Sequence, residues 1–178
     1  MVKMKRLKDG QSGFTLVELI IAIAIAAVIT GGITAAIMQI LTINHRDSNH
    51  MIAVRQVQQA GDQVSKDALQ AQVVNATGTQ GVPLILTWQE WGTNTTHIVT
   101  YDLTDMSSGL KKLQRKHYVN SVLNLTTVVA EYIDPSQTSC VPPGVLAPSG
   151  VLNFTVTATV GTESETRTYK IEPRPDSL

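Results

Sequence analysis

The chain contains a single cysteine, Cys140, among its 178 residues. No internal disulfide can form, so packing and hydrogen bonds alone must hold the fold together. A lone cysteine is usually an inert thiol, and we expect that role at Cys140 ahead of an intermolecular bridge or an attached lipid. A lipoprotein signal would need a cysteine near the amino terminus, and residues 1–20 contain none.

An excess of either charge is also absent, because 14 basic residues balance 14 acidic ones. A neutral chain gives no reason to expect a nucleic-acid partner. The balance hides an uneven distribution, since residues 1–13 hold four of the bases and one of the acids. Without that segment the chain keeps 10 bases and 13 acids, a net charge of about −3. The length leaves room for one modest globular domain, so a multidomain enzyme is not expected.

Proline is missing from residues 14–74. Proline inside a helix costs about 3 kcal/mol, so its absence permits one long helix. Residues 14–43 are apolar almost throughout and long enough to cross a bilayer. Residues 44–74 repeat small or apolar side chains every three or four positions, which predicts an amphipathic helix packed by one face on a domain, with Asp67 off that face. The repeating positions are Met51, Val54, Val57, Gly61, Val64, Ala68 and Ala71.

The apolar run at residues 14–43 has three interpretations. A cleaved secretory signal would end near the small-x-small patterns at residues 22–26, but the run continues far beyond the usual 7–15 apolar residues. A plain signal anchor fits the basic residues before it, which keep that end cytoplasmic. Neither interpretation explains Glu18, because a carboxylate in a membrane-length helix costs about 2.5–3.5 kcal/mol and is usually functional.

The third interpretation accounts for a glycine, a phenylalanine and an acid at fixed spacing, in the run Gly13, Phe14, Thr15, Leu16, Val17 and Glu18. This run resembles the processing and assembly signal of type IV pilins and pseudopilins. The resemblance implies that a prepilin peptidase removes the basic leader, residues 1–13, by cutting between Gly13 and Phe14, and methylates the new amino group of Phe14. It also implies that Glu18 pairs with the Phe14 amine of a neighbouring subunit. Before cleavage we expect Glu18 to be poorly satisfied.

The resemblance further implies a pilin-like α+β fold, in which a long N-terminal helix packs on a C-terminal antiparallel β-sheet head. Residues 14–43 would be the transmembrane and filament-core helix, residues 44–74 its amphipathic continuation, and residues 75–178 the head. Gly31 and Gly32 each cost about 0.5–1 kcal/mol inside a helix. They indicate either close helix packing in the membrane or, by the resemblance, a segment that melts on filament assembly.

From the same resemblance we expect a non-enzymatic structural subunit of a type IV pilus or a type II secretion-like filament. It would be held in the cytoplasmic membrane with its head outside before it enters an extracytoplasmic filament or reaches the cell surface. Its partners would be other subunits, the peptidase–methyltransferase, the inner-membrane assembly platform and, before assembly, membrane lipid. No cofactor is expected. Many major pilins carry proline near Ala35, and its absence here favours a minor pilin or a J-type pseudopilin.

The head is predicted from short β-branched and aromatic segments separated by turn residues. They predict an antiparallel sheet whose last hairpin turns at residues 160–164. Residues 134–150 are rich in proline and glycine and predict a loop. The predicted strands are residues 83–88, 97–101, 110–118, 126–133, 152–160 and 166–171.

No catalytic or metal-binding group is predicted. His45 and His50 are five apart, which does not place them on one helix face, and each of the four histidines, His97 and His117 included, is expected to be solvated. A calcium site is conceivable, but its acids lack the alternating spacing of a calcium loop, so a turn-forming role is preferred for each. These acids are Asp102, Asp105 and Asp134.

A basic cluster at residues 111–117 is the one candidate patch for DNA. On a strand its side chains divide between two faces, and we prefer the interpretation of a solvated strand whose charges discourage edge pairing. Trp88 and Trp91 are an odd number apart, so one should fill the core and the other should be exposed as a possible contact for a partner.

Two other classes of function stay open. A single-pass, membrane-anchored binding or sensor domain would never polymerise, and its Gly13–Phe14 bond would stay uncut. An envelope enzyme would need a clustered polar site in the head, which the sequence does not show.

Overall fold

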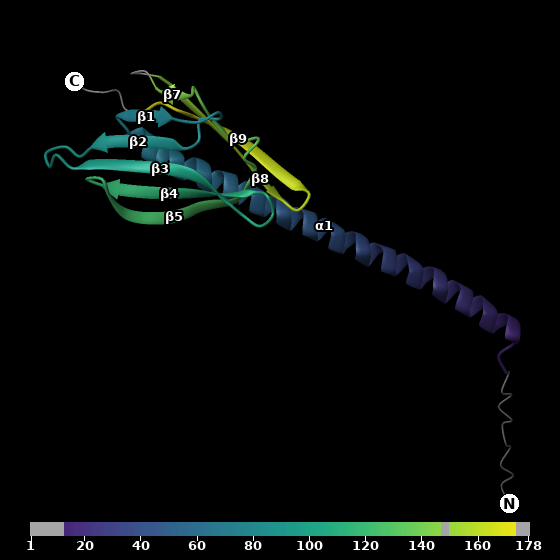
Figure 1. The fold of residues 1–178 in the computed structure, drawn as a ribbon. Helices are drawn as coiled ribbons and strands as arrows, with labels where there is room; N and C mark the ends of the chain where they lie inside the picture. Colours follow the sequence, from purple (N-terminus) through teal and green to yellow (C-terminus); the bar gives the residue numbers. More distant parts are fainter. Residues whose placement is uncertain (1–12, 147–149, 174–178) are drawn as a thin grey trace, which may run out of the picture. The chain divides into compact units, whose positions relative to one another are not determined.

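The computed structural model describes residues 13–146 and 150–173 (Figure 1). In that part of the chain one helix, α1 (Leu16–Gln70), precedes nine strands. The chain divides into two compact units between residues 44 and 45. The strands are β1 (Val73–Ala76), β2 (Leu84–Gln89), β3 (Thr96–Asp105), β4 (Lys111–Val119), β5 (Val122–Ile133), β6 (Ser139–Val141), β7 (Gly144–Val145), β8 (Leu152–Val160) and β9 (Glu163–Ile171).

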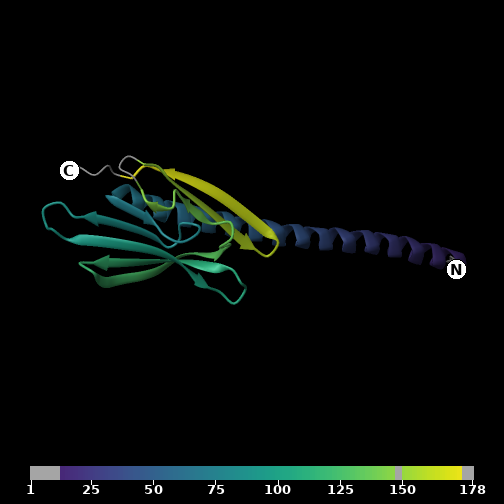
Figure 2. The same cartoon turned by 45° about the horizontal axis from the view of Figure 1, so that its top comes forward.

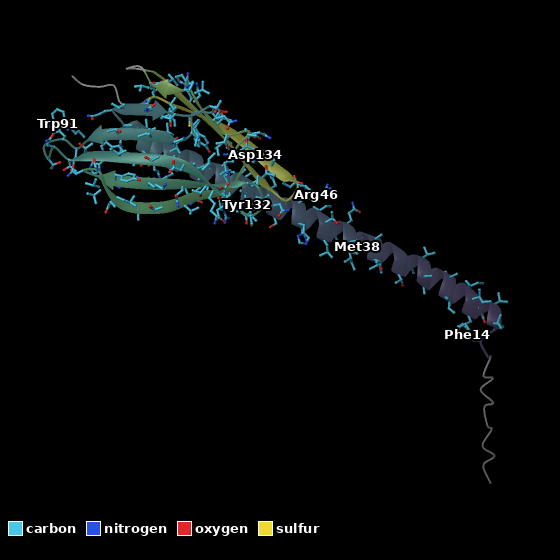
Figure 3. All side chains as sticks on the ribbon, in the orientation of Figure 1. Phe14, Met38, Arg46, Trp91, Tyr132 and Asp134 are labelled. Atoms are coloured by element: carbon cyan, nitrogen blue, oxygen red, sulfur yellow. The ribbon has the colours of Figure 1, made fainter. Side chains whose placement is uncertain are left out.

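The first unit is the amino-terminal part of α1, which is apolar and uncovered. Every residue from 13 to 44 is exposed, and an 18-residue window of α1 has a mean hydropathy of 2.5 with none of it buried. Figure 3 shows side chains projecting from all sides of the helix between Phe14 and Met38. A helix that is apolar all round suits a membrane or the core of a larger assembly. By length and composition, α1 can cross a membrane.

The second unit is an antiparallel sheet with α1 packed against it. The strand order is β6-β8-β5-β4-β3-β2-β1-β7, and β9 pairs with β8. The meander β2–β5 and the hairpin β8–β9 are joined in one sheet by a single residue pair in the strand ladder, Ile133 with Ala158. Next to that pair the β4–β5 register shifts, and Tyr132 has a φ of 61°. Such a bulge bends its strand, and Figure 2 shows α1 lying between the meander and the hairpin.

The carboxy-terminal part of α1 buries a stripe of small side chains. Its positions repeat every three or four residues, as the amphipathic pattern predicts. Against this stripe lie the largest side chains of the core, which come from the strands. The buried apolar residues of the helix are Ala53, Val57, Ala60, Val64 and Ala68, and those of the strands include Leu84, Leu86, Val99, Tyr101, Leu113, Leu152, Phe154 and Val156.

Gly61 brings α1 into direct contact with β9. A Cβ atom at this position would lie 1.9 Å from Cζ of Tyr169. The Tyr169 hydroxyl donates a hydrogen bond to the carbonyl of Val57 at 3.1 Å. The aromatic ring therefore occupies the space that any other side chain at Gly61 would need.

Three details of the predicted helix are wrong. It ends at Gln70, four residues before the predicted end at Val74, because Val73 starts a strand that pairs with β2. The buried stripe starts at Ala53, whereas Met51 is exposed. Asp67, predicted to lie off the stripe, is buried within it.

The six predicted strands are present as β2, β3, β4, β5, β8 and β9. The last hairpin turns as predicted, since Val160 pairs with Glu163. The predicted loop at residues 134–150 is wrong in part, because β6 and β7 lie there. β6 pairs with β8 and β7 with β1. Strands this short depend on partners distant in the sequence, which a local pattern does not reveal.

Candidate functional site

Helix α1 begins with a reciprocal cap formed by Thr15 and Glu18. The Glu18 backbone N–H donates to Thr15 Oγ1 at 3.3 Å. In return, Glu18 Oε2 accepts the Thr15 backbone N–H at 3.0 Å and the Thr15 hydroxyl at 2.8 Å. This arrangement is a capping box, which satisfies N–H groups that have no partner inside the helix. The helix begins at Leu16, so only Phe14 and the capping Thr15 separate it from the predicted cleavage bond after Gly13.

The expectation that Glu18 is poorly satisfied before cleavage is wrong, because its own chain provides two donors. A carboxylate can accept about four hydrogen bonds, so capacity remains for a further donor. Phe14, which the prediction makes the new amino terminus, lies immediately before the cap and is 79% exposed. Its place at the start of α1 is labelled in Figure 3.

Gly31 and Gly32 lie within the continuous helix. No atom would lie within 4 Å of a Cβ added at either position, apart from the neighbouring helix backbone. Neither glycine is therefore required by packing within the described chain. Whether this segment melts stays a prediction.

Residues 8–34 match the family described as the Prokaryotic N-terminal methylation motif, the signal of type IV pilins and pseudopilins. The chain therefore carries the amino-terminal signal of type IV pilin-like proteins. Proteins of this kind are generally non-enzymatic structural subunits, and the apolar start of α1 with this motif is consistent with inner-membrane anchoring before assembly. The match covers Gly13, Phe14 and Glu18 but stops short of the head. No curated protein and no solved structure matches the chain.

In the second unit, a buried polar cluster joins α1 to the sheet. Arg115 on β4 donates from Nε to Oδ2 of Asp67 at 2.6 Å and from Nη2 to Oδ1 at 3.1 Å. The Tyr101 hydroxyl donates to the same carboxylate at 2.5 Å. Burial and the negative charge of Asp67 raise the pKa of Tyr101, so the phenol stays protonated. The bidentate geometry links one position of the helix to one position of the sheet.

His97 and His117, which we expected to be solvated, come together on β3 and β4. His97 Nδ1 and His117 Nε2 lie 3.1 Å apart in a hydrogen bond. The indole of Trp88 stacks on both imidazoles, with centroids 5.3 Å from His97 and 6.1 Å from His117. Burial, then the charge of Arg115, lowers the pKa of His117. The predicted strands 97–101 and 110–118 are consecutive. Pairing them as an antiparallel hairpin would have placed His97 and His117 next to each other.

The basic cluster of β4 does not form a free patch. Lys111 pairs with Asp105, Lys112 with Glu131 at 2.8 Å, and Lys116 with Asp102 at 2.8 Å. Arg115 is held by Asp67. Each of the four bases therefore has a carboxylate partner, which leaves little net charge for a DNA backbone to neutralise.

The acids considered for calcium have other partners. Asp102 and Asp105 are paired with lysines, while Asp134 accepts the backbone N–H of Ser136 at 2.9 Å in a turn. Among residues 13–146 and 150–173, no three His, Cys, Asp or Glu side chains are grouped to hold a metal ion. Cys140 is buried, and burial raises the pKa of its thiol to about 12. It is therefore neither reactive nor placed to bridge two chains.

The two tryptophans differ in exposure as predicted, but for another reason. Trp88 lies on β2 and packs against the core. Trp91 is 87% exposed because it follows the end of β2, where alternation between two faces no longer applies.

Proposed function

We propose that this pilin-like protein is a minor pilin or pseudopilin, a structural subunit of a type IV pilus or a type II secretion-like filament. The observation that carries the proposal is the spacing of Gly13, Phe14 and Glu18 in the matched motif, directly at the start of an uncovered apolar helix. The absence of proline from this helix supports the minor or pseudopilin role. Its partners are other subunits, the prepilin peptidase–methyltransferase and the inner-membrane assembly platform.

Electrostatics supplies the assembly mechanism. Cleavage after Gly13 creates a cationic amine at Phe14, which is costly to bury without an anion. The Glu18 carboxylate of an incoming subunit pairs with this amine on a neighbour, and each charge offsets the desolvation of the other in the filament core. Glu18 then holds two roles, as half of its own helix cap and as the partner of a neighbour's amine. Gly31 and Gly32 form the segment in which helicity is lost as subunits pack.

Glu18→Gln separates the two roles of this residue. Glutamine also completes a capping box, so the helix start should persist while the charge is lost. We expect the variant to be cleaved normally but to fall about tenfold or more in sheared filaments, because a buried amine is left without its anion. The measurement is the ratio of processed protein in the filament and membrane fractions.

Thr15→Ala is the matched control. It removes the hydroxyl of the cap, at a cost of about 1 kcal/mol to the helix start, but keeps the Glu18 charge. This variant should still enter filaments. If Glu18→Gln incorporates normally while Thr15→Ala does not, Glu18 serves only the cap and the pairing mechanism is wrong.

A further inference from the structure

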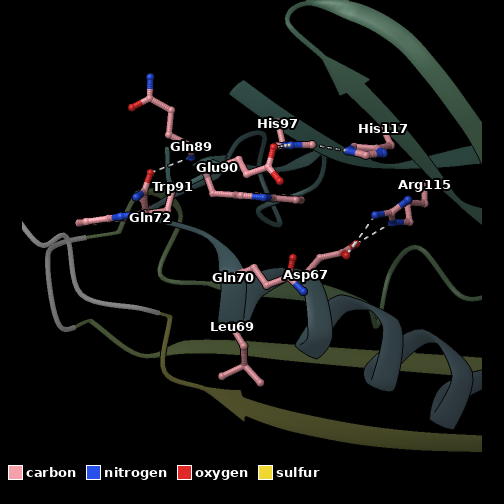
Figure 4. Close-up of a pocket in the computed structure, with 11 residues that line it drawn as sticks. Asp67, Leu69, Gln70, Gln72, Gln89, Glu90, Trp91, His97, Arg115 and His117 are labelled. Carbon is pink, nitrogen blue, oxygen red and sulfur yellow. Dashed lines mark hydrogen bonds and ion pairs between the residues drawn. The ribbon is translucent and has the colours of Figure 1, made fainter. Parts of the chain in front are cut away.

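A cavity of about 640 Å³ lies at the carboxyl end of α1, within the second unit (Figure 4). Its volume is in the range of about 300–1,000 Å³ that ligand pockets occupy. The last turn of α1 forms one side, and the end of β2 with the neighbouring parts of β3 and β4 forms the other. None of its lining residues belongs to the processing signal.

Aromatic rings are concentrated around this cavity. The stacked Trp88, His97 and His117 form part of its lining, and Trp91 stands beside it with most of its indole in water. A single exposed apolar side chain needs no explanation. Two indoles at one cavity do need an explanation, because these are the only tryptophans in the chain. Trp91 offers a flat apolar face to a ligand, and Trp88 supports the imidazole rings beside it.

Side-chain amides at the mouth are held in fixed orientations. Gln72 Oε1 accepts the backbone N–H of Gln89 at 2.9 Å, so its NH₂ group is left to donate. Gln89 Nε2 donates to Asn94 Oδ1 at 3.0 Å, so its oxygen is left to accept. Both residues line the cavity, and Figure 4 shows them near Trp91 at one end of it. Donors and acceptors fixed in advance lower the entropy lost on binding.

The charges of the lining do not favour an anionic ligand. The charge of Arg115 is balanced by Asp67, which accepts two of its N–H groups, and burial lowers the pKa of His117, which favours its neutral form. The remaining charge is Glu90, whose Oε2 accepts the Thr93 hydroxyl at 2.9 Å. A cationic ligand would interact with the aromatic rings and with Glu90, but it would not accept a hydrogen bond from the Gln72 NH₂ group. A neutral ligand with apolar faces and many hydroxyl groups uses every one of these features.

We propose that this cavity binds a neutral saccharide. The indole of Trp91 stacks on the apolar C–H face of a pyranose ring, while Gln72, Gln89 and Glu90 bond its hydroxyl groups, which both donate and accept. The inference goes beyond filament assembly and does not depend on it. A head that binds sugar would do so whether or not the chain polymerises.

Tryptophan fluorescence tests the proposal directly, because the chain's only two indoles lie at the cavity. The full chain is placed in nanodiscs, since glycoside detergents would themselves present sugar. It is titrated with glucose, galactose, N-acetylglucosamine and the disaccharides cellobiose, lactose and chitobiose, up to about 50 mM, well above weak millimolar affinities. Choline chloride and sodium phosphate serve as the cationic and anionic probes. We expect a saturable change with at least one saccharide.

Variants then locate the site. Trp91→Ala and Gln72→Ala should weaken the affinity for that saccharide tenfold or more by calorimetry, while the control Gln59→Ala, on the exposed face of α1, should leave it unchanged. Three results would overturn the proposal: no saturable change with any of the six sugars, saturation with choline or phosphate alone, or equal affinity in Trp91→Ala.

Discussion

Gly61 is a single residue on which the contact between α1 and β9 depends. Gly61→Ala should gain up to about 1 kcal/mol of helix propensity. It should lose more, because the new methyl group must displace the ring of Tyr169, which packs with Phe154 in the core. We expect a net destabilisation of about 1–2 kcal/mol, measured by denaturant unfolding of the full chain in nanodiscs with tryptophan fluorescence as the signal.

The background Tyr169→Ala provides the control for this effect. With the ring removed, the same Gly61→Ala change should become neutral or stabilising, because only helix propensity remains. Equal destabilisation in both backgrounds would show that the ring does not require glycine at this position.

His117 makes the stability of the head depend on pH. Its pKa is lowered in the folded chain by burial, Arg115 and His97. The unfolded chain therefore binds more protons as the pH falls through about 6.5, and stability falls with it until the folded ring also protonates. Thermal unfolding at about pH 7.5 and pH 5.5 should show this loss, and His117→Gln should reduce it.

The exposed His45 is the matched control, because His45→Gln should leave the pH dependence as it is in the parent chain. If both variants behave alike, the dependence arises elsewhere in the protein. The sign is also a test, since greater stability at pH 5.5 would contradict the lowered pKa.

Among the elements, β5 has an unprotected edge. In the described chain it pairs with β4 on one side and with β8 only at Ile133. The free edge is covered at one point, because the backbone N–H of Glu131 donates to the side-chain oxygen of Gln56 on α1 at 2.7 Å. Residues 122–130 carry no charge, and several of their apolar side chains are exposed. These are Val122, Leu123, Leu125 and Val128.

An edge of this kind favours association, because unpaired backbone groups and apolar side chains can add another strand. Leu123→Lys should therefore lower self-association of the full chain several-fold at a given concentration, measured by light scattering in micelles. Thr168→Lys on β9 is the control, since that strand already carries Glu165, Arg167 and Lys170. Equal effects of the two lysines would attribute the change to charge in general.

Elements with a long local pattern could be predicted from the sequence. The absence of proline and the three-to-four-residue period predict α1. The alternation of β-branched residues predicts β2, β3, β8 and β9. Contacts between distant residues could not be predicted. Asp67 has the period of the buried stripe, but its burial depends on Arg115, 48 residues away in the chain. His97 and His117 meet only in the register of β3 on β4.

At the scale of the whole molecule, two units of opposite character share one helix. Residues 13–44 expose an apolar surface that only lipid or other subunits can cover, whereas residues 45–70 are already packed on a sheet. The processing signal lies entirely in the first unit, and the cavity at Trp88 and Trp91 lies in the second. The proposed assembly and the proposed saccharide binding therefore involve separate parts of the chain, and variants in one part should leave the other intact.

Mass spectrometry of the amino-terminal peptide is the most direct test of the central claim. The sample is native membranes together with any filaments sheared from the cell surface. The pilin-type pathway predicts a peptide that begins at Phe14 and carries one additional methyl group. A peptide that retains Met1, or one that begins after Ala24 or Ala26, would contradict the account and leave a membrane-anchored or secreted β-sheet domain that does not assemble through Phe14 and Glu18.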